Sequence, residues 1–191
     1  MNATDKMSVV IVDDEEDVRS LYLTVVEELL PDAEIFEAND GLEALNLIMA
    51  VQPDIVISDI KMPNMDGRRL LKVAREFRNS CQFIFISGFG KDYLYEFLRY
   101  GAFDVLEKPL NIDELEETIS RALYCINHQK KTRDKIGSLL KENGVSEEVK
   151  AQIFDLQDKL LKERYTNNMQ EDIDSEEEDD DDFFPNGGGY M

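Results

Sequence analysis

Short apolar runs alternate with amphipathic stretches over the first two-thirds of the chain. The runs are continuous stretches of apolar residues, rich in valine and isoleucine, with no polar residue at every second position. This pattern is typical of strands that are covered on both faces. The stretches between them carry apolar residues at spacings of three and four, which predicts helices. Strands and helices in this order predict an α/β fold with a parallel sheet between two layers of helices. The five predicted strands centre on residues 9–12, 35–36, 55–57, 83–86 and 105–106.

Polar residues mark the ends of several predicted helices. Asp40 and Asn111 are expected N-caps, and Pro31 ends the first helix. We interpret Asp66-Gly67 as a turn and cap without a chemical role. A further helix is expected from about Asp92 to Arg99.

Charged and hydroxyl side chains follow four of the predicted strands. Asp13 and Asp14 follow the first strand, Asp59 the third, Ser87 the fourth and Lys108 the fifth. Carboxyl ends of parallel strands meet at one edge of a sheet, so these groups should converge. Three converging carboxylates require a cation, and hard oxygen ligands favour Mg²⁺. A carboxylate nucleophile beside a metal, a lysine and a hydroxyl suits phosphoryl transfer.

Each of these residues also has a simpler explanation when taken singly. Asp13-Asp14 could cap a helix, Asp59 could be a turn acid, and Lys108 could be a surface lysine. All five positions would then have to match by coincidence, so we favour the functional interpretation.

Four segments resemble the signatures of response-regulator receiver domains of two-component signalling: VVIVDDEEDVR, DIVISDIKMPNMDG, FIFISG and GAFDVLEKP. The resemblance covers residues from about 6 to 127 and is specific because all the motifs must agree in order and spacing. It implies a receiver domain at residues 5–127 with a doubly wound, flavodoxin-like sheet of strand order 2-1-3-4-5. It also implies a signalling switch that promotes only its own phosphorylation and dephosphorylation, not an enzyme for external substrates.

The resemblance assigns a role to each acidic residue. Asp59 would accept a phosphoryl group from a histidine kinase or a phosphotransfer protein. Mg²⁺ would be bound by the side chains of Asp14 and Asp59 and by the backbone carbonyl of Lys61. Asp13 would act on the metal mostly through water.

The resemblance also assigns roles around the phosphoryl group. Ser87 would bond a phosphoryl oxygen, and Lys108 would pair with the aspartyl phosphate and precede Pro109 through a cis peptide bond. Gly88 either leaves room for the phosphodonor or is a turn glycine. Phe89, like Lys61, occupies a position that tunes phosphate lifetime, and its ring could hinder the attacking water.

One position departs from the family pattern. Receivers usually carry an aromatic residue three positions before the lysine, and its ring moves inward on phosphorylation. Here that residue is Val105, which is small and stiff. Phe103 has the same strand parity and could substitute only in part, so we expect phosphorylation without the usual readout on this face.

After the receiver pattern, residues 128–165 predict a helical hairpin. Asn143-Gly144 should separate its two helices, and Ser146 should cap the second. The hairpin could form a homodimer, which we prefer, or pack on its own receiver domain. His128, the only histidine, is better explained as an exposed helix residue than as a phosphotransfer group. The apolar positions of the two helices are Ile136, Leu139, Leu140, Val149, Ile153, Leu156 and Leu160.

Residues 166–191 are expected to be a disordered acidic tail. Ten acids and no base lie between Glu171 and Asp182, which contributes much of the formal net charge of -21. Phe183-Phe184 then resembles a short interaction motif, although two stray aromatic residues in a solvating tail are equally consistent. The acidic balance disfavours binding of nucleic acid.

Two remaining patterns bear on location. No apolar run is long enough for a membrane span, and Cys81 and Cys125 lack a paired spacing, so a reducing, cytoplasmic setting is expected. Both cysteines should be mostly buried.

These observations leave two hypotheses for function. The first is a response regulator that accepts a phosphoryl group on Asp59 and controls an unidentified downstream protein through contact, without a DNA-binding output domain. The second is a constitutive scaffold with a receiver fold, acting through its helical extension and acidic tail. Val105 favours the second hypothesis, and the intact acid cluster favours the first.

Overall fold

The computed structural model describes residues 6–77, 81–88 and 94–157. Within these ranges, five strands alternate with five helices, and a further helix covers residues 147–157. The strands are β1 (Ser8–Val12), β2 (Glu34–Ala38), β3 (Ile55–Asp59), β4 (Gln82–Ser87) and β5 (Asp104–Glu107). The helices are α1 (Glu16–Leu29), α2 (Gly41–Val51), α3 (Gly67–Phe77), α4 (Leu94–Arg99) and α5 (Ile112–Glu142).

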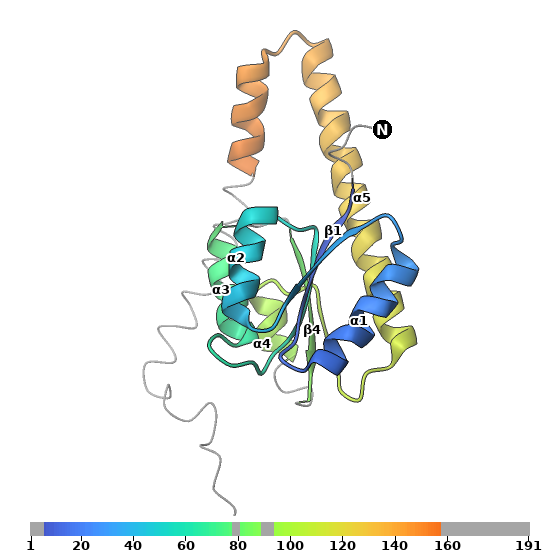
Figure 1. Cartoon of the computed structure of the whole chain (residues 1–191). Coiled ribbons are helices and arrows are strands. Elements are labelled where there is room, and N and C mark those ends of the chain that lie inside the picture. Colours follow the sequence, from blue (N-terminus) through green and yellow to red (C-terminus); the bar gives the residue numbers. More distant parts are fainter. Residues whose placement is uncertain (1–5, 78–80, 89–93, 158–191) are drawn as a thin grey trace, which may run out of the picture.

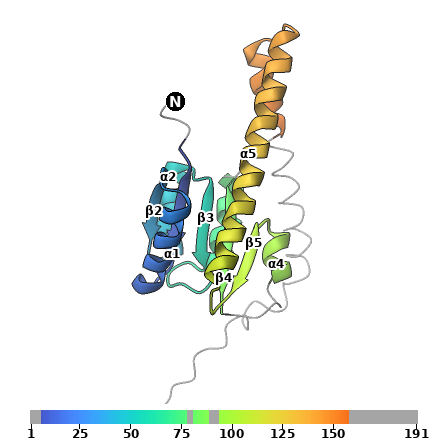
Figure 2. The same cartoon turned by 90° about the vertical axis from the view of Figure 1, so that its right-hand side faces the viewer.

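The strands form one parallel sheet in the order β2-β1-β3-β4-β5, which confirms the predicted fold and strand order. Helices α1 and α5 cover one face, whereas α2, α3 and α4 cover the other (Figures 1 and 2). All the strands therefore point their carboxyl ends toward the same edge of the sheet. The strand order reverses between β1 and β3, the type of position at which such sheets bind ligands.

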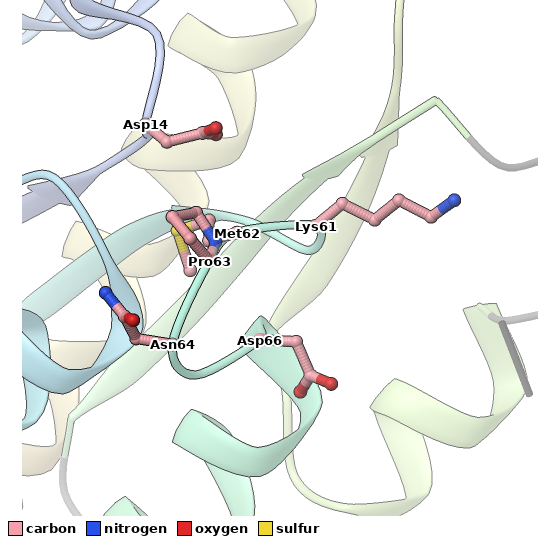
Figure 3. A pocket seen from close by; sticks show the side chains of 6 residues that line it. All are labelled: Asp14, Lys61, Met62, Pro63, Asn64 and Asp66. Atoms are coloured by element: carbon pink, nitrogen blue, oxygen red, sulfur yellow. The ribbon is translucent and has the colours of Figure 1, made fainter. Parts of the chain in front are cut away.

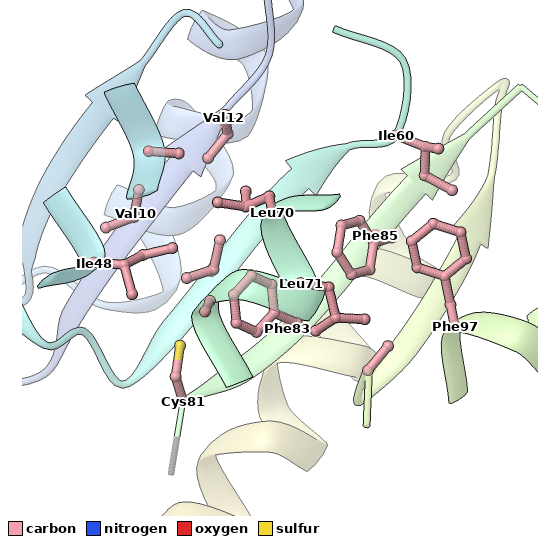
Figure 4. Packing of buried hydrophobic residues seen from close by; sticks show 14 of the residues in the cluster. Val10, Val12, Ile48, Ile60, Leu70, Leu71, Cys81, Phe83, Phe85 and Phe97 are labelled. Carbon is pink, nitrogen blue, oxygen red and sulfur yellow. The ribbon is translucent and has the colours of Figure 1, made fainter. Parts of the chain in front are cut away.

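Alternate residues of the central strands supply the two hydrophobic cores. Val10 and Val12 face α2, α3 and α4 and pack with Phe83 and Phe85 of β4 (Figure 4). Their neighbours in sequence face α1 and α5 instead. Burial on both faces explains why these strands have continuous apolar sequences.

Side-chain caps begin three helices where the sequence indicated. Asp40 accepts a hydrogen bond from the Glu43 amide at 2.8 Å, and Asn111 accepts one from the Asp113 amide at 3.0 Å. Asp66 accepts from the Arg69 amide at 2.7 Å, as its turn-and-cap interpretation predicted.

The last receiver helix is much longer than the domain that it covers. Helix α5 has 31 residues and runs without a break through the predicted boundary at residue 127. After a turn containing Gly144, the helix of residues 147–157 returns along α5, and the pair projects away from the sheet (Figure 1). The Arg133 guanidinium lies 4.6 Å from the centre of the Phe154 ring, a contact that the sequence did not indicate.

Several sequence predictions concern residues outside the described ranges. These are Phe89, the expected helix start at Asp92, Leu160 and the acidic tail. Cys81 is buried and Cys125 is partly exposed but mostly buried, as expected for both cysteines. In the described part of the chain, no helix is long and apolar enough to span a membrane.

Candidate functional site

The register of the sheet brings the ends of four strands level with one another. Val12 pairs with Ser58 across β1 and β3, and Ser87 pairs with Glu107 across β4 and β5. Polar residues at or directly after these strand ends therefore lie at one edge, as the strand pattern predicted. They are Asp13, Asp59, Ser87 and Lys108.

Lys108 is the cation that holds this group together. Its Nζ lies 2.9 Å from Oδ1 of Asp59 and 3.5 Å from Oδ2 of Asp13. Its backbone amide donates to the Ser87 carbonyl at 2.7 Å, which fixes the start of the side chain beside β4. The peptide bond from Lys108 to Pro109 is cis, as the resemblance implied. One lysine thus bridges two carboxylates from different strands.

Asp13 is fully buried, and its two oxygens have different surroundings. Oδ1 accepts a hydrogen bond from the Glu15 amide at 2.9 Å. Oδ2 has no hydrogen-bond partner among the described residues, because Lys108 lies too far away for a good bond. Burial raises the pKa of Asp13, although the Glu15 amide and the Lys108 charge act in the opposite direction. Its carboxylate therefore has unused capacity for a positively charged ligand.

The charge of Lys108 is secured by its partners. Burial alone would lower the pKa of Lys108, but the hydrogen bond and charge of Asp59, together with Asp13, raise it above its ordinary value. Asp59 is itself 7% exposed, so this ion pair is largely shielded from water. A permanent ammonium beside a nearly buried carboxylate is suited to holding an incoming dianion.

Asp14 differs from Asp13 in being exposed, and it lies over an open depression beside the loop that follows β3 (Figure 3). The Lys61 side chain extends away from Asp14, so only its backbone belongs to the predicted metal site (Figure 3). The depression is lined by Asp14, Lys61, Met62, Pro63, Asn64 and Asp66.

Two close contacts hold the loop after β3 in place. Asn64 has a left-handed backbone with φ of 62° and donates from Nδ2 to Oδ2 of Asp40 at 2.6 Å. Gly67 donates its amide to the Ile60 carbonyl at 2.8 Å, and a Cβ at Gly67 would lie 2.8 Å from the Asp59 carbonyl oxygen. Glycine is therefore required for α3 to begin so close to Asp59.

The donor chemistry fits a hard divalent cation. Carboxylate oxygens of Asp13, Asp14 and Asp59 and the carbonyl of Lys61 are ligands of the type that Mg²⁺ prefers. Within the described ranges, no three histidine, cysteine or acidic side chains are already grouped closely enough to enclose a metal. Lys108 lies between two of the carboxylates instead. The unpartnered oxygen of Asp13 is the observation that favours a cation here.

The structure adds two residues that the sequence pattern did not connect with the site. Arg19 donates from Nη1 to the Asp13 carbonyl at 2.9 Å and from Nε to Glu37 at 3.0 Å. Tyr22 of α1 has a buried hydroxyl with no hydrogen-bond partner among the described residues. Burial and the charges of Asp13 and Asp59 raise the pKa of Tyr22. Both residues lie on α1, and the spacing of residues along one helix cannot reveal contacts with other elements.

The remaining site predictions have mixed outcomes. Ser87 is 1% exposed at the end of β4, and a Cβ at Gly88 would meet nothing within 4 Å, so there is open space beside the serine.

Val105 packs against the core under α2, α3 and α4, whereas Phe103 packs against the core under α1 and α5. The prediction that Phe103 shares the face of Val105 is wrong, because Phe103 precedes β5 and the strand alternation does not apply to it.

The geometry defines a class of protein: a parallel α/β domain with acidic residues and a lysine at the carboxyl ends of its strands. A family model described as the response regulator receiver domain matches residues 9–120, more than half of the chain. The protein belongs to this receiver family of two-component signalling. Phosphorylation on aspartate and use of Mg²⁺ are general features of the family.

Individual relatives agree with this assignment. The chain is 37% identical over 126 residues to regulatory protein AtoC of Escherichia coli, covering 65% of this chain and 27% of that protein. It is 31% identical over 116 residues to sporulation initiation phosphotransferase F of Bacillus subtilis, covering 60% of this chain and 92% of the relative. The solved receiver domain of the Francisella response regulator 1452 is 32% identical, with a TM-score of 0.57, and covers 65% of this chain and 99% of that structure. The chain thus spans about a quarter of the length of some relatives and nearly all of others.

Proposed function

We propose that Asp59 is the phosphoacceptor of this receiver and takes its phosphoryl group from a phosphohistidine of a histidine kinase or phosphotransfer protein. The observation that carries the proposal is the 2.9 Å pairing of Lys108 Nζ with Asp59 at the carboxyl end of the central strand. Asp59 is largely shielded from water, yet its surroundings include a depression through which a donor could approach.

The transfer exchanges one bond to phosphorus for another. An oxygen of Asp59 attacks phosphorus in line with the P–N bond, a new P–O bond forms, and the P–N bond breaks. The bonding electrons return to the imidazole nitrogen of the donor, which then takes up a proton. Lys108 stabilises the charge on the phosphoryl oxygens, and Ser87 donates a hydrogen bond to one of them.

The residues that would hold Mg²⁺ are Asp13, Asp14, Asp59 and the backbone carbonyl of Lys61. The cation, when bound, would neutralise charge on the carboxylates and the phosphoryl oxygens. Asp13 would act on the cation mostly through a bridging water and through the electrostatic field of its buried carboxylate. Lys108 orients Asp59 through their 2.9 Å ion pair.

We further propose that phosphorylation is transmitted by contact with a downstream protein, not by catalysis on external substrates or by binding DNA. The aspartyl phosphate adds about -1.5 to -2 charge at the strand ends. Val105 offers no large ring that could move between exposed and buried positions. The extension beyond the receiver, with residues 128–165 as a hairpin and 166–191 as an acidic tail, supplies the alternative surface for partners.

The proposed partner of the hairpin is a second copy of the chain. Three large apolar side chains of the hairpin remain substantially exposed: Leu139 at 49%, Val149 at 44% and Leu156 at 57%. Val149 and Leu156 are seven residues apart, so they lie on one face of their helix, as in a coiled-coil seam. Leu156→Glu should lower the dimer fraction in sedimentation at matched concentration, and an unchanged fraction would contradict this role.

The proposed acceptor role is tested with a small-molecule phosphodonor and Mg²⁺. The intact protein should gain the mass of one phosphoryl group, and the gain should disappear in Asp59→Asn and after chelation of the metal. Asp66→Asn serves as a matched control, because Asp66 lines the same depression but caps α3. No Asp59-dependent gain would overturn the proposal and favour the constitutive scaffold.

A further inference from the structure

A shallow hollow on the α5 side of the sheet lies away from the acidic pocket. Its walls are largely apolar, and it is lined by Phe103, Glu117, Ser120, Arg121, Tyr124 and Cys125. Arg121 forms one rim, with its guanidinium 5.8 Å from the centre of the Phe103 ring and 2.5 Å from Oδ2 of Asp104. Tyr124 is 72% exposed, so a large aromatic side chain is left open to solvent.

A basic stripe continues from this hollow along α5. Arg121, Tyr124, His128, Lys131 and Lys135 recur at spacings of three and four, which places them on one face of the helix. The Tyr124 and His128 rings stack with centroids 6.1 Å apart, which confirms that the face is continuous. Lys131 and Lys135 are exposed and make no ion pair with any residue of the described ranges.

Neighbouring cations of α5 have other contacts. Lys130 lies 3.0 Å from Asp54, and Arg133 lies over the Phe154 ring. The hairpin therefore covers a different side of α5 and leaves the stripe accessible. In a chain of net charge -21, exposed cations beside an apolar hollow are complementary in charge and polarity to an acidic segment that carries aromatic residues.

We propose that this surface binds the C-terminal segment of the same chain, residues 171–184, with its acids along the stripe and Phe183-Phe184 in the hollow. The segment has ten acids between Glu171 and Asp182, directly followed by the two phenylalanines. Passing along α5 from Lys135 toward Arg121, the surface offers cations first and the apolar hollow second. The order of charge and aromatic residues is thus the same in the segment and in its binding surface.

The length of the intervening chain permits this contact. Phe154 packs beside Arg133, so the described chain ends at Gln157 next to the middle of α5. Residues 158–170 can span up to about 43 Å when extended. The stripe from Lys135 to Arg121 is about 21 Å long, and the helix is about 10–12 Å wide. The segment can therefore pass around α5 and reach the hollow without moving the hairpin.

The reactivity of Cys125 reports occupancy of the hollow in the full chain. Cys125 lines the hollow, whereas Cys81 is only 1% exposed, so a maleimide should react with Cys125 and leave folded Cys81 intact. In Cys125→Ser this maleimide reaction should be lost, which assigns the measured modification to Cys125. Two double variants test binding of the segment in low salt: Phe183→Ala/Phe184→Ala and Lys131→Glu/Lys135→Glu. Each should raise the rate of Cys125 modification about fivefold or more, because a tethered segment has a high effective concentration and protects Cys125 strongly in the native chain.

The matched control is Arg69→Glu/Lys72→Glu, which makes the same charge change on α3, the helix that covers the opposite face of the sheet from α5 (Figure 1). Its modification rate should equal that of the native chain. An equal rate in the native chain and both test variants would overturn the proposal. Protection that increases with protein concentration would overturn binding within one chain and assign the segment to the hollow of a second copy.

Discussion

The Nζ atom of Lys130 lies 3.0 Å from Oδ1 of Asp54, and this ion pair joins α5 to the amino-terminal edge of the sheet. The other oxygen of Asp54 accepts the Ser8 amide at 3.0 Å. One carboxylate therefore connects the start of β1, the start of β3 and the place where α5 leaves the receiver. The Lys108–Asp59 pair lies at the opposite, carboxyl-terminal edge of the sheet, so the hairpin and the proposed phosphorylation site lie at different ends of the domain.

Substitutions at this joint should have unequal effects on stability. Asp54→Ala should lower the free energy of unfolding by about 1–2 kcal/mol, because the Ser8 amide also loses its acceptor. Lys130→Ala should cost less than about 1 kcal/mol, because that side chain is 47% exposed and the ion pair is screened. Urea unfolding measures both values. Equal losses, or a larger loss for Lys130→Ala, would contradict the bridging role of Asp54.

Replacing Asp13 by asparagine should stabilise the protein. Burial raises the pKa of Asp13 from its ordinary 3.8, so the folded state disfavours the charged form at neutral pH. In metal-free buffer at pH 7, Asp13→Asn should raise the free energy of unfolding, because the neutral amide costs less to bury than the carboxylate. Exposed Asp14 provides the control, and Asp14→Asn should change the value by less than about 0.5 kcal/mol.

The gain in Asp13→Asn should depend on pH in one direction. The pKa of Asp13 is higher in the folded state than in the unfolded state. The native protein therefore loses stability as the pH rises from the unfolded-state pKa, near 3.8, through the folded-state pKa. Asparagine does not titrate. The difference in free energy of unfolding between Asp13→Asn and the native protein should therefore increase between these two pKa values and stay constant at higher pH. Urea unfolding from acid to neutral pH measures this difference. A gap that narrows with rising pH would contradict the burial argument.

Mg²⁺ should stabilise the native protein by binding the folded state. At a free concentration ten times the dissociation constant, the free energy of unfolding should rise by about 1.4 kcal/mol. Asp14→Asn and Asp59→Asn should lose most of this increment, while Asp32→Asn, at an exposed position remote from the site in sequence, should retain it. Thermal unfolding across a Mg²⁺ titration gives the comparison. An increment that survives in Asp59→Asn would place the cation elsewhere.

Much of the fold could be predicted because buried parallel strands have a direct sequence pattern. Continuous apolar runs located the strands, and their carboxyl ends indicated where Asp13, Asp59 and Lys108 would meet. Helix starts were also predictable, because a cap such as Asp40 acts on backbone amides close to it in sequence. These predictions depend on local periodicity and on the fact that the carboxyl ends of parallel strands meet at one edge of the sheet. The structure confirms the positions of the strands and of these helix starts.

The features that were missed depend on contacts between elements. Tyr22 lies on the buried face of α1, and periodicity along that helix could not show that its hydroxyl lies near the acidic residues. Phe103 was assigned to the wrong face because alternation fails outside β5, which begins one residue later. The contact of Phe154 with Arg133 joins two helices of the hairpin, and no spacing within either helix reveals it.

Two glycines near the site should differ in their tolerance of alanine. A Cβ at Gly41 would lie 2.2 Å from the Met65 carbonyl oxygen, whereas a Cβ at Gly88 would meet nothing within 4 Å. Alanine normally favours a helix over glycine by about 1 kcal/mol, but at Gly41 the clash with backbone should outweigh this gain.

We expect Gly41→Ala to lower the free energy of unfolding by about 1–3 kcal/mol and to displace the loop that carries Asn64. Gly88→Ala should change stability by less than about 0.5 kcal/mol and act only on access to Asp59. Urea unfolding and the rate of phosphorylation by a small donor separate the two effects. A stable Gly41→Ala protein with native Mg²⁺ affinity would show that the loop after β3 can move away from α2 without disturbing the site.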